Sequence, residues 1–366
     1  MKILVTGADG FLGWHTRARL SCLTEHEVVP VGRETWADLP GLAEGADAIL
    51  HLAAMNKFTP EAEDANAGLA ADVAAAVKAA GCSPRIVYSN TIHSRTETSY
   101  GRGKALAART LERVAAEVGG HFVDVVLPNL FGEHGRPNYN SFVATFADSV
   151  ASGQQPAEVN DREITVMHAQ TAAQALIDAL STRQQLMTPP ATATTVRGVL
   201  DALTRFMDVY ATGEIPELRT PLDVSLFNTL RATLFPAHYP IPLTAHADNR
   251  GRLVETVRAH GGTGQTFVST THPGITRGEH FHLAKVERFV VVGGEARISL
   301  RRLFHDEVLD FHVTGAEPVV IDMPTMWVHN ITNTGSTELT TMFWTNTLFD
   351  PANPDTYWQP VRPEGS

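Results

Sequence analysis

The sequence predicts two consecutive domains, an α/β domain built on a parallel sheet and then an all-β domain. In the first half, short apolar runs alternate with segments of helical periodicity, the pattern of repeated strand–helix–strand units. A glycine-rich turn follows the first apolar run. Towards the C-terminus, short alternating runs are separated by glycine and proline, which is typical of antiparallel strands in a sandwich or small barrel.

The elements of the first domain follow from this alternation. We expect strands at residues 3–6, 27–31, 46–53, 85–89 and 122–127, and helices at residues 11–22, 61–80 and 100–118. Residues 148–235 are more helical and are expected to form the substrate-binding part of the same unit. A proline-rich stretch from Phe235 to Pro242 then ends the pattern. We therefore predict domains at residues 1–243 and 244–366.

In the second domain the apolar positions predict short strands. They are expected at residues 266–271, 288–292, 296–300, 308–313, 319–321 and 339–344. The formal net charge of −11 argues against nucleic acid or an anionic membrane as the main partner. The chain opens with an apparent buried strand rather than a signal peptide, and no apolar run approaches the ~20 residues of a membrane span. We expect a cytoplasmic enzyme.

A dinucleotide site is predicted at the first turn. Gly7, Gly10 and Gly13 follow the first strand and open the first helix. Glycine lets the backbone approach a pyrophosphate, and the helix N-terminus offers N–H groups and a positive dipole. Arg33 stands at the end of the second strand, where an NAD-binding protein usually has Asp or Glu. An arginine there suits the extra phosphate of NADP, although an ordinary surface arginine is the alternative.

An acid–base pair for carbonyl reduction is predicted on the helix that follows the fourth strand. Tyr100 and Lys104 are four residues apart, on one face of that helix. A ketone that receives hydride needs a proton, and a phenol with an unperturbed pKa of ~10 donates one poorly at neutral pH. A neighbouring ammonium stabilises the phenolate. Thr91 is placed to orient the carbonyl. A surface tyrosine beside a solvated lysine is the alternative.

A metal site is predicted in the second domain. His280 and His282 are two residues apart, so on a strand both face the same side. Glu287 and His329 complete a set of three histidines and one carboxylate, which leaves coordination positions open. The spacing from Gly274 to Gly294 reads G-x5-H-x-H-x4-E-x6-G. Buried histidines satisfied by hydrogen bonds are the alternative.

These motifs resemble two known families. Residues 6–13, 51–54, 89–91, 100–104 and 128–132 are similar to the extended short-chain dehydrogenase/reductase superfamily, which has a Rossmann-like α/β fold. The metal motif resembles the cupin family, an all-β jelly roll, although Met326 stands where the second cupin pattern has glycine. In the superfamily members that act on nucleotide sugars, the tyrosine is the acid/base, the lysine its partner and the threonine the orienting residue. These roles carry over to Tyr100, Lys104 and Thr91.

One activity of that superfamily is disfavoured by the sequence. Sugar dehydratases place Asp-Glu after the threonine, whereas Thr91 is followed here by Ile92 and His93. The order of the two domains resembles one narrow family, the bifunctional reductase–epimerases of UDP-N-acetyl-L-fucosamine biosynthesis, used in bacterial capsule and O-antigen assembly. The resemblance implies a homodimer whose cupin domain, with zinc or another divalent metal, epimerises a UDP-linked 4-keto-6-deoxy amino sugar beside the ketone. The short-chain domain then reduces the ketone with NADPH.

The resemblance also implies contact residues. Cofactor contacts are implied for Gly7, Gly10, Phe11, Leu12, Gly13, Arg33, His51, Leu52, Ala53, Tyr100 and Lys104. Substrate contacts are implied for Asn129, Asn138, Arg162, Arg250 and Glu255. Lys285 lies between two expected ligands and is our candidate for the epimerase base or enolate partner. Two departures, Val126 for the family's arginine and Gln170-Thr171 for its consecutive aspartates, leave the identity of the sugar open.

Two other functions fit the sequence. One is a plain nucleotide-keto-sugar reductase or 4-epimerase in which the cupin is purely structural. Arg33 disfavours the 4-epimerase, because NADP suits net reduction with cofactor exchange. The other is a non-enzymatic NADP-binding sensor with a metal-binding regulatory domain. Tyr100 and Lys104 disfavour the sensor, which has no use for an acid–base pair.

Overall fold

The computed structural model describes residues 1–154, 156 and 159–363. The chain forms two compact units, Met1–Phe142 with Asp161–Val196, and Val143–Asn160 with Arg197–Ser366. It passes from one unit to the other at residues 142, 160 and 196 rather than at a single point. The functional boundary between residues 243 and 244 therefore stays a prediction.

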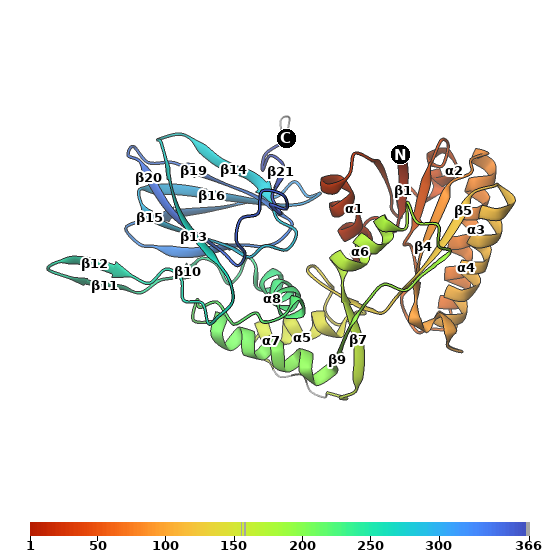
Figure 1. Ribbon diagram of the computed structural model, residues 1–366, viewed down its shortest axis with the longest axis horizontal. Helices are drawn as coiled ribbons and strands as arrows, with labels where there is room; N and C mark the ends of the chain where they lie inside the picture. The colour runs from red at the N-terminus through yellow and green to blue at the C-terminus, as the bar shows by residue number, and fades with distance from the viewer. Residues whose placement is uncertain (155, 157–158, 364–366) are drawn as a thin grey trace. The chain divides into compact units, whose positions relative to one another are not determined.

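The first unit contains, within the described residues, a six-stranded parallel sheet in the order β2-β1-β3-β4-β5-β8 (Figure 1). Its strands are β1 (Lys2–Thr6), β2 (Glu27–Val31), β3 (Ala48–His51), β4 (Arg85–Thr91), β5 (His121–Leu127) and β8 (Leu186–Met187). The central strands are apolar and buried on both faces, as expected for a parallel sheet covered by helices. A smaller sheet joins β6 (Asn129–Phe131), β7 (Glu163–His168) and β9 (Thr192–Thr195).

Helices cover both faces of the large sheet. They are α1 (Phe11–Leu23), α2 (Leu39–Leu42), α3 (Ala62–Ala80), α4 (Ser99–Glu117) and α6 (Ala169–Asp178), with short 3-10 turns η1 (Trp36–Asp38) and η2 (Ile92–Arg95). The core on one face joins α2, α3 and α4 to the sheet, and the core on the other joins α1 and α6. The predicted Rossmann-like domain is confirmed, with its strands and helices within a few residues of the expected bounds.

The second unit contains two described antiparallel sheets of five strands each, in the orders β10-β18-β15-β20-β13 and β17-β16-β19-β14-β21. The strands are β10 (Ile241–Pro242), β13 (Gln265–Thr271), β14 (Thr276–Phe281), β15 (Glu287–Gly293), β16 (Glu295–Arg302), β17 (Val308–Thr314), β18 (Val319–Met323), β19 (Trp327–Asn333), β20 (Leu339–Thr345) and β21 (Tyr357–Trp358). A separate hairpin, β11 (Ala245–Asp248) with β12 (Gly251–Val254), projects from these sheets (Figure 1). The predicted all-β domain is confirmed.

Three of the described helices lie in the second unit, α5 (Phe142–Ala151), α7 (Val196–Tyr210) and α8 (Pro221–Leu234). A buried ion pair joins the end of α7 to the sheets. Arg288 on β15 donates to both oxygens of Asp322 on β18, at 2.7 and 2.9 Å, and both side chains are 0% exposed. The Tyr210 hydroxyl donates to Asp322 at 2.6 Å, and Arg288 donates to the carbonyl of Gly213. These bonds explain why α7 packs with the β-strands that follow it.

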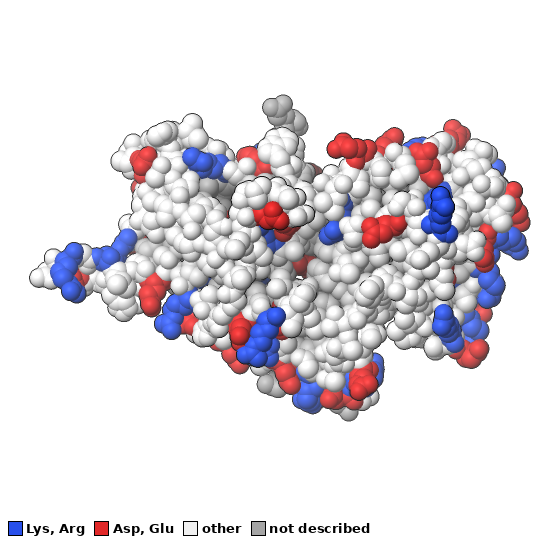
Figure 2. Space-filling model, in the orientation of Figure 1, with Lys and Arg blue, Asp and Glu red and all other residues white. Residues whose placement is uncertain are grey.

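None of the described helices combines the length and the apolar character needed to cross a membrane. On the face drawn in Figure 2, acidic and basic side chains of the described residues are interspersed rather than gathered into one continuous basic area.

Candidate active site and metal centre

The turn between β1 and α1 is closed so tightly that only glycine fits. Gly7 has a φ of +67°, and the N–H of Gly10 donates to the carbonyl of Gly7 at 2.9 Å. A Cβ atom at Gly13 would lie 2.1 Å from that same carbonyl oxygen. Gly10 is the N-cap of α1 and contributes no capping side chain, so the first N–H groups of the helix stay available to an anion. The cradle fits the diphosphate of a dinucleotide.

The predicted cofactor residues at the end of β3 lie against this turn. An added Cβ at Gly7 would meet the backbone nitrogen of Ala53 at 2.7 Å. The Thr6 hydroxyl accepts from the N–H groups of Leu52 and Ala53 and lies 2.8 Å from Nδ1 of His51. Burial, followed by the charge of Lys104, lowers the pKa of His51 to about 3, so its ring is neutral. Because the Thr6 hydroxyl already accepts two N–H groups, its own proton is left to donate to Nδ1.

Arg33 lies two residues after the end of β2, at the carboxyl edge of the sheet, the same edge from which the glycine-rich turn leaves β1. Its side chain is exposed and has no hydrogen bond or ion pair to another described residue. An added Cβ at the preceding Gly32 would lie 2.3 Å from Oδ2 of Asp9, which comes from the glycine-rich turn. The end of β2 and the turn are therefore adjacent, as the prediction for Arg33 requires.

The structure brings Thr91, Tyr100 and Lys104 together at the carboxyl end of β4. Thr91 is the last residue of β4, and α4 begins after Thr98, whose hydroxyl accepts from the N–H of Gly101. The Thr91 side chain lies close enough to the Tyr100 phenol to lower its pKa. Lys104 is buried, donates to the carbonyl of Ser89 at 2.6 Å and lies 4.2 Å from the ring centroid of Tyr88.

Burial shifts both titrating groups of this pair. It raises the pKa of Tyr100 above its usual range, which the hydrogen bond to Thr91 partly offsets. It lowers the pKa of Lys104 to about 7, and the carboxylate of Asp124 acts in the opposite direction. The protonation of Lys104 is therefore sensitive to pH near neutrality, as is common for catalytic lysines.

Two aromatic neighbours of Tyr100 were not predicted from the sequence. The ring of Phe58, which is 62% exposed, meets Tyr100 edge-on with centroids 5.1 Å apart. His93 contacts both rings, with its centroid 5.4 Å from Phe58 and 6.5 Å from Tyr100. Phe58 lies in an irregular segment with no motif, so no sequence signal identifies it. His93 drew notice only because it departs from the dehydratase pattern.

A cationic and aromatic group lies in the loops of the same unit. Lys57 and Arg136 both approach the Tyr139 ring, at 5.2 and 5.4 Å from its centroid. Asn138, a predicted substrate residue, directly precedes Tyr139 and has a φ of +54°. The other two predicted residues of this unit have different surroundings. Asn129 donates to the carbonyl of Thr165 between β6 and β7, and Arg162 is exposed just before β7.

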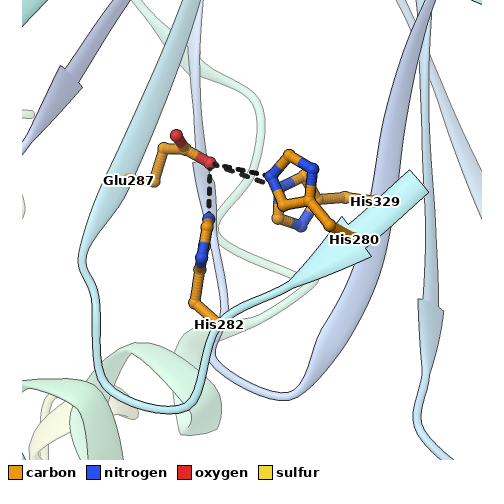
Figure 3. A group of neighbouring side chains, drawn as sticks. All are labelled: His280, His282, Glu287 and His329. Carbon is orange, nitrogen blue, oxygen red and sulfur yellow. Dashed lines mark hydrogen bonds and ion pairs between the residues drawn. The ribbon is translucent and has the colours of Figure 1, made fainter. Parts of the chain in front are cut away.

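The predicted metal ligands form one cluster in the second unit (Figure 3). Register places His280 on β14 directly opposite His329 on β19, whereas Glu287 begins β15 in the other sheet. His282 lies one residue beyond β14, and a bulge with Glu279 at φ +63° precedes the pair. The side chains therefore converge between the two sheets, with His282 on the loop rather than on the expected strand.

The spacing of these side chains suits a tetrahedral metal. Oε2 of Glu287 lies 2.8 Å from Nε2 of His282, 3.2 Å from that of His329 and 4.0 Å from that of His280. Two ligands of a tetrahedral zinc at ~2.1 Å are about 3.4 Å apart. Although burial alone would raise the pKa of Glu287, the histidines hold it well below its usual range. Burial lowers the pKa of His280 to about 3, so this ring is neutral, as a metal ligand must be.

Backbone carbonyls fix two of the rings in the orientation that a metal needs. Nδ1 of His329 lies 3.0 Å from the carbonyl of Trp327, and Nδ1 of His282 lies 2.5 Å from the carbonyl of Asp355. A carbonyl only accepts, so each Nδ1 donates a proton to it, and Nε2, which faces Glu287, is the nitrogen left to bind a metal. The donor set therefore fits zinc or a similar divalent ion.

The other predicted residues of the second unit contact their local neighbours. The Lys285 ammonium donates to the carbonyl of Pro354 at 2.7 Å and to the Thr356 hydroxyl at 3.2 Å. These contacts tie the C-terminal segment to the metal loop, and they do not support Lys285 as a base. Arg250 pairs with Asp248 in the β11–β12 hairpin, and Glu255 pairs with Arg258. Both pairs are exposed, and neither includes a residue of the histidine cluster.

Comparison with known proteins accounts for both halves of the chain. Residues 3–186 match the NAD dependent epimerase/dehydratase family, and residues 246–357 match the polysaccharide biosynthesis C-terminal domain. A UDP-2-acetamido-2,6-beta-L-arabino-hexul-4-ose reductase from Pseudomonas aeruginosa is 32% identical over 368 residues, covering 98% of each chain. The family match implies a nicotinamide cofactor.

Solved structures give the same result. The capsular polysaccharide assembling protein CapF from Staphylococcus aureus has a TM-score of 0.62 and 31% identity, with 98% of this chain and 100% of that chain covered. A Thermus thermophilus UDP-glucose 4-epimerase, at 19% identity, a TM-score of 0.51 and 57% of this chain, shares the fold of the first part. The family predicted from the sequence is confirmed. The chain belongs to the NAD dependent epimerase/dehydratase family, and nearly its whole length is similar to the P. aeruginosa reductase and to CapF.

Proposed function

We propose that this protein reduces a UDP-linked 4-keto-6-deoxy amino sugar with NADPH, after its C-terminal domain has epimerised the carbon beside the ketone. The observation that carries the proposal is the convergence of Thr91, Tyr100 and Lys104 beside a glycine-only dinucleotide cradle. The P. aeruginosa relative, named as a reductase of such a sugar, aligns over nearly the whole chain. A 4-keto sugar is the substrate class for which this set of side chains is suited.

The reductase residues have separate roles in this scheme. NADPH, held at the glycine-rich turn, would supply the hydride for the carbonyl carbon. The Tyr100 phenol donates its proton to the carbonyl oxygen as negative charge develops there, and the Thr91 hydroxyl orients that oxygen. The Lys104 ammonium stabilises the phenolate that remains. Solvent then returns a proton to Tyr100, which completes the cycle.

The cofactor preference and the setting of the reaction are part of the proposal. Arg33, exposed beside the glycine turn, is the residue that would bind the 2′-phosphate of NADP. We infer a cytoplasmic homodimer, since the reaction consumes NADPH and the family resemblance implies two copies. His280, His282, Glu287 and His329 would hold zinc or another divalent metal. Such an ion stabilises an enolate beside a ketone, or it holds the two sheets together.

Solvent deuterium exchange separates the possible activities. A UDP-4-keto-6-deoxy amino sugar is incubated in D₂O with and without NADPH, and deuterium at the carbon beside the ketone is measured by mass spectrometry. Label that enters without NADPH indicates an epimerising C-terminal domain. Reduction without label indicates a reductase whose C-terminal domain is structural. If neither label nor NADPH oxidation is detected under any condition, the proposal is wrong and the sensor is favoured.

Two variants assign each activity to its half of the chain. Tyr100→Phe should abolish most NADPH oxidation while deuterium still enters, because the phenol is needed only for reduction. His329→Ala should lose deuterium entry while the protein still reduces a sugar that has already been epimerised. If either variant loses both deuterium entry and NADPH oxidation, the assignment of one activity to each half of the chain is contradicted.

A further inference from the structure

A row of three side chains crosses the parallel sheet beneath α4, the helix that carries Tyr100 and Lys104. Strand register aligns His51 on β3 with Tyr88 on β4, and Tyr88 with Asp124 on β5. Neighbours in register on parallel strands point to the same face, which here is the face that α4 covers. Lys104 lies above the middle of this row, with its ammonium over the Tyr88 ring and bonded to the carbonyl of Ser89.

Asp124 is also connected to Thr91 by hydrogen bonds. Nδ2 of Asn90 donates to Oδ2 of Asp124 at 2.9 Å, and Oδ1 of Asn90 accepts from the N–H of Thr91 at 2.8 Å. A carboxylate only accepts, so Asp124 sets which end of the Asn90 amide faces Thr91. Oδ1 of Asp124 is buried and has no hydrogen-bond partner among the described residues.

We propose that Asp124 is a positioning residue of the reductase site, whose carboxylate keeps Lys104 protonated and, through Asn90, fixes the backbone of Thr91. The proposal rests on the proposed reductase activity and adds a residue that none of the sequence motifs contains. It acts on the acid–base pair from the side of the sheet, without contact to substrate or cofactor.

Among the titratable groups near Lys104, Asp124 is the one whose negative charge favours the protonated lysine. His51 is neutral, and burial, together with the neighbouring Tyr100 and Asp124, raises the pKa of Tyr88 well above its usual range. Tyr100, one turn away on α4, is also protonated because burial raises its pKa. Burial lowers the pKa of Lys104 to about 7, and Asp124 opposes that shift. On the neighbouring helix α3, Glu63 is bonded to Arg102, on the exposed side of α4.

Asp124 has its own charged neighbours. Burial raises its pKa, the bond from Asn90 and the charge of Lys104 lower it, and Glu112 and Arg95 act weakly in opposite directions. It also lines a pocket of about 370 Å³ between α4, β5 and β8, together with Glu112 and Arg109. A carboxylate beside such a pocket keeps some hydration, which supports its charged form. Glu112 lines the same pocket, so it offers a matched control.

Lysine NMR measures the proposed effect without substrate. The chain has five lysines, so ¹³C-lysine labelling gives few signals, and Lys104→Arg assigns one of them. In the full-length protein, Asp124→Asn should move the titration midpoint of the Lys104 ε-carbon to lower pH by roughly half a unit or more. Glu112→Gln should leave the midpoint at its wild-type value. Equal midpoints in wild type and Asp124→Asn would overturn the proposal.

The activity profile gives a second readout. In Asp124→Asn, the loss of kcat/KM on the alkaline side should begin at lower pH than in wild type, and Asp124→Glu should restore the wild-type profile. If Asp124 had only a structural role, its substitution would lower kcat/KM at every pH without shifting the alkaline side of the pH profile. Asn90→Ser should lower kcat and shift the Lys104 midpoint less than Asp124→Asn does, because it removes the connection to Thr91 but leaves the carboxylate in place. An Asp124→Asn limb that coincides with wild type would contradict the proposal.

The two proposals can fail separately. If the wild-type protein oxidises no NADPH with a keto-sugar, the reductase function fails, while the NMR titration still decides whether Asp124 holds the proton on Lys104. Thermal unfolding by circular dichroism verifies that each variant is folded. Should Asp124→Asn not fold, Asp124→Ser replaces it in the same comparison.

Discussion

A single methyl group at Gly13 tests the cofactor cradle. In Gly13→Ala, the new Cβ would lie 2.1 Å from the carbonyl oxygen of Gly7 and 2.9 Å from Cα of Ala8. Both atoms belong to the backbone of the turn. Gly7 is itself packed against the backbone of Ala53, which limits how far the turn can shift. Non-bonded heavy atoms pack at about 3.5–4.0 Å, so the turn must move by roughly 1 Å from the start of α1.

The expected loss follows from the bonds that such a movement breaks. A hydrogen bond to a charged group contributes about 1.5–3 kcal/mol, so losing one N–H bond to the cofactor phosphate should raise the Kd for NADPH about 10- to 150-fold. Gly68 is the matched control, since it is an exposed residue of α3 whose added Cβ meets no described atom within 4 Å. Gly68→Ala should stabilise the fold by about 0.5–1 kcal/mol and leave NADPH binding unchanged.

Nicotinamide fluorescence measures the Kd for NADPH, and urea unfolding measures the stability of both variants. The same chemical change should therefore weaken binding at one glycine and strengthen the fold at the other. If Gly13→Ala binds NADPH within about twofold of wild type, the turn does not hold the cofactor and the nucleotide site must be sought elsewhere.

The other predictions concern the acid–base pair, the buried ion pair and the metal cluster. Tyr100→Phe should lower the rate of NADPH oxidation about 10²–10⁴-fold with a much smaller change in the Kd for NADPH, and near wild-type turnover would refute its role. The kcat/KM of the reductase should fall as pH rises above about 7, because Lys104, with a pKa of about 7, then loses the proton that stabilises the phenolate. A profile flat to pH 9 would contradict that assignment. Asp322→Ala should lower the free energy of unfolding by about 3–5 kcal/mol in urea, because it leaves Arg288 buried without its carboxylate, and a loss under about 1 kcal/mol would show that the pair matters little. His282→Ala should remove the bound divalent metal in elemental analysis, and wild-type metal content in that variant would mean that the cluster is not the site.

The parallel sheet could be predicted because its signal is local and strong. Strands β1, β3, β4 and β5 contain apolar runs buried on both faces, α3 ends at Gly81 in the left-handed conformation, and α4 begins at the Thr98 cap. The metal strands were harder, since Thr276–Phe281 contains Arg, Gly, Glu and His where an ordinary strand would alternate apolar residues. There the ligand spacing identified the site although the hydrophobic pattern did not identify the strand.

Long-range contacts set what the sequence could not predict. Asp355 accepts from the N–H groups of Leu283, Ala284 and Lys285, about seventy residues earlier, and its own carbonyl orients His282. Spacing placed Lys285 between two ligands, but the direction of its side chain depends on this distant segment. Asp124 was missed for a similar reason, because only strand register brings it beside Tyr88 and below Lys104.

Two residues of the departures from the family pattern, Val126 and Gln170, lie in the interior of the first unit, whereas Thr171 is exposed. Val126 is buried on β5, and Gln170 is buried at the start of α6. The Gln170 amide bonds Nδ1 of His15 and accepts from Arg19, while Nε2 of His15 bonds the carbonyl of Glu133. Glu133 is itself a fully buried carboxylate paired with His168 at 2.9 Å. An aspartate at position 170 would add a second buried carboxylate to this network, whereas the neutral Gln170 accepts from Arg19 and bonds His15 without adding a charge.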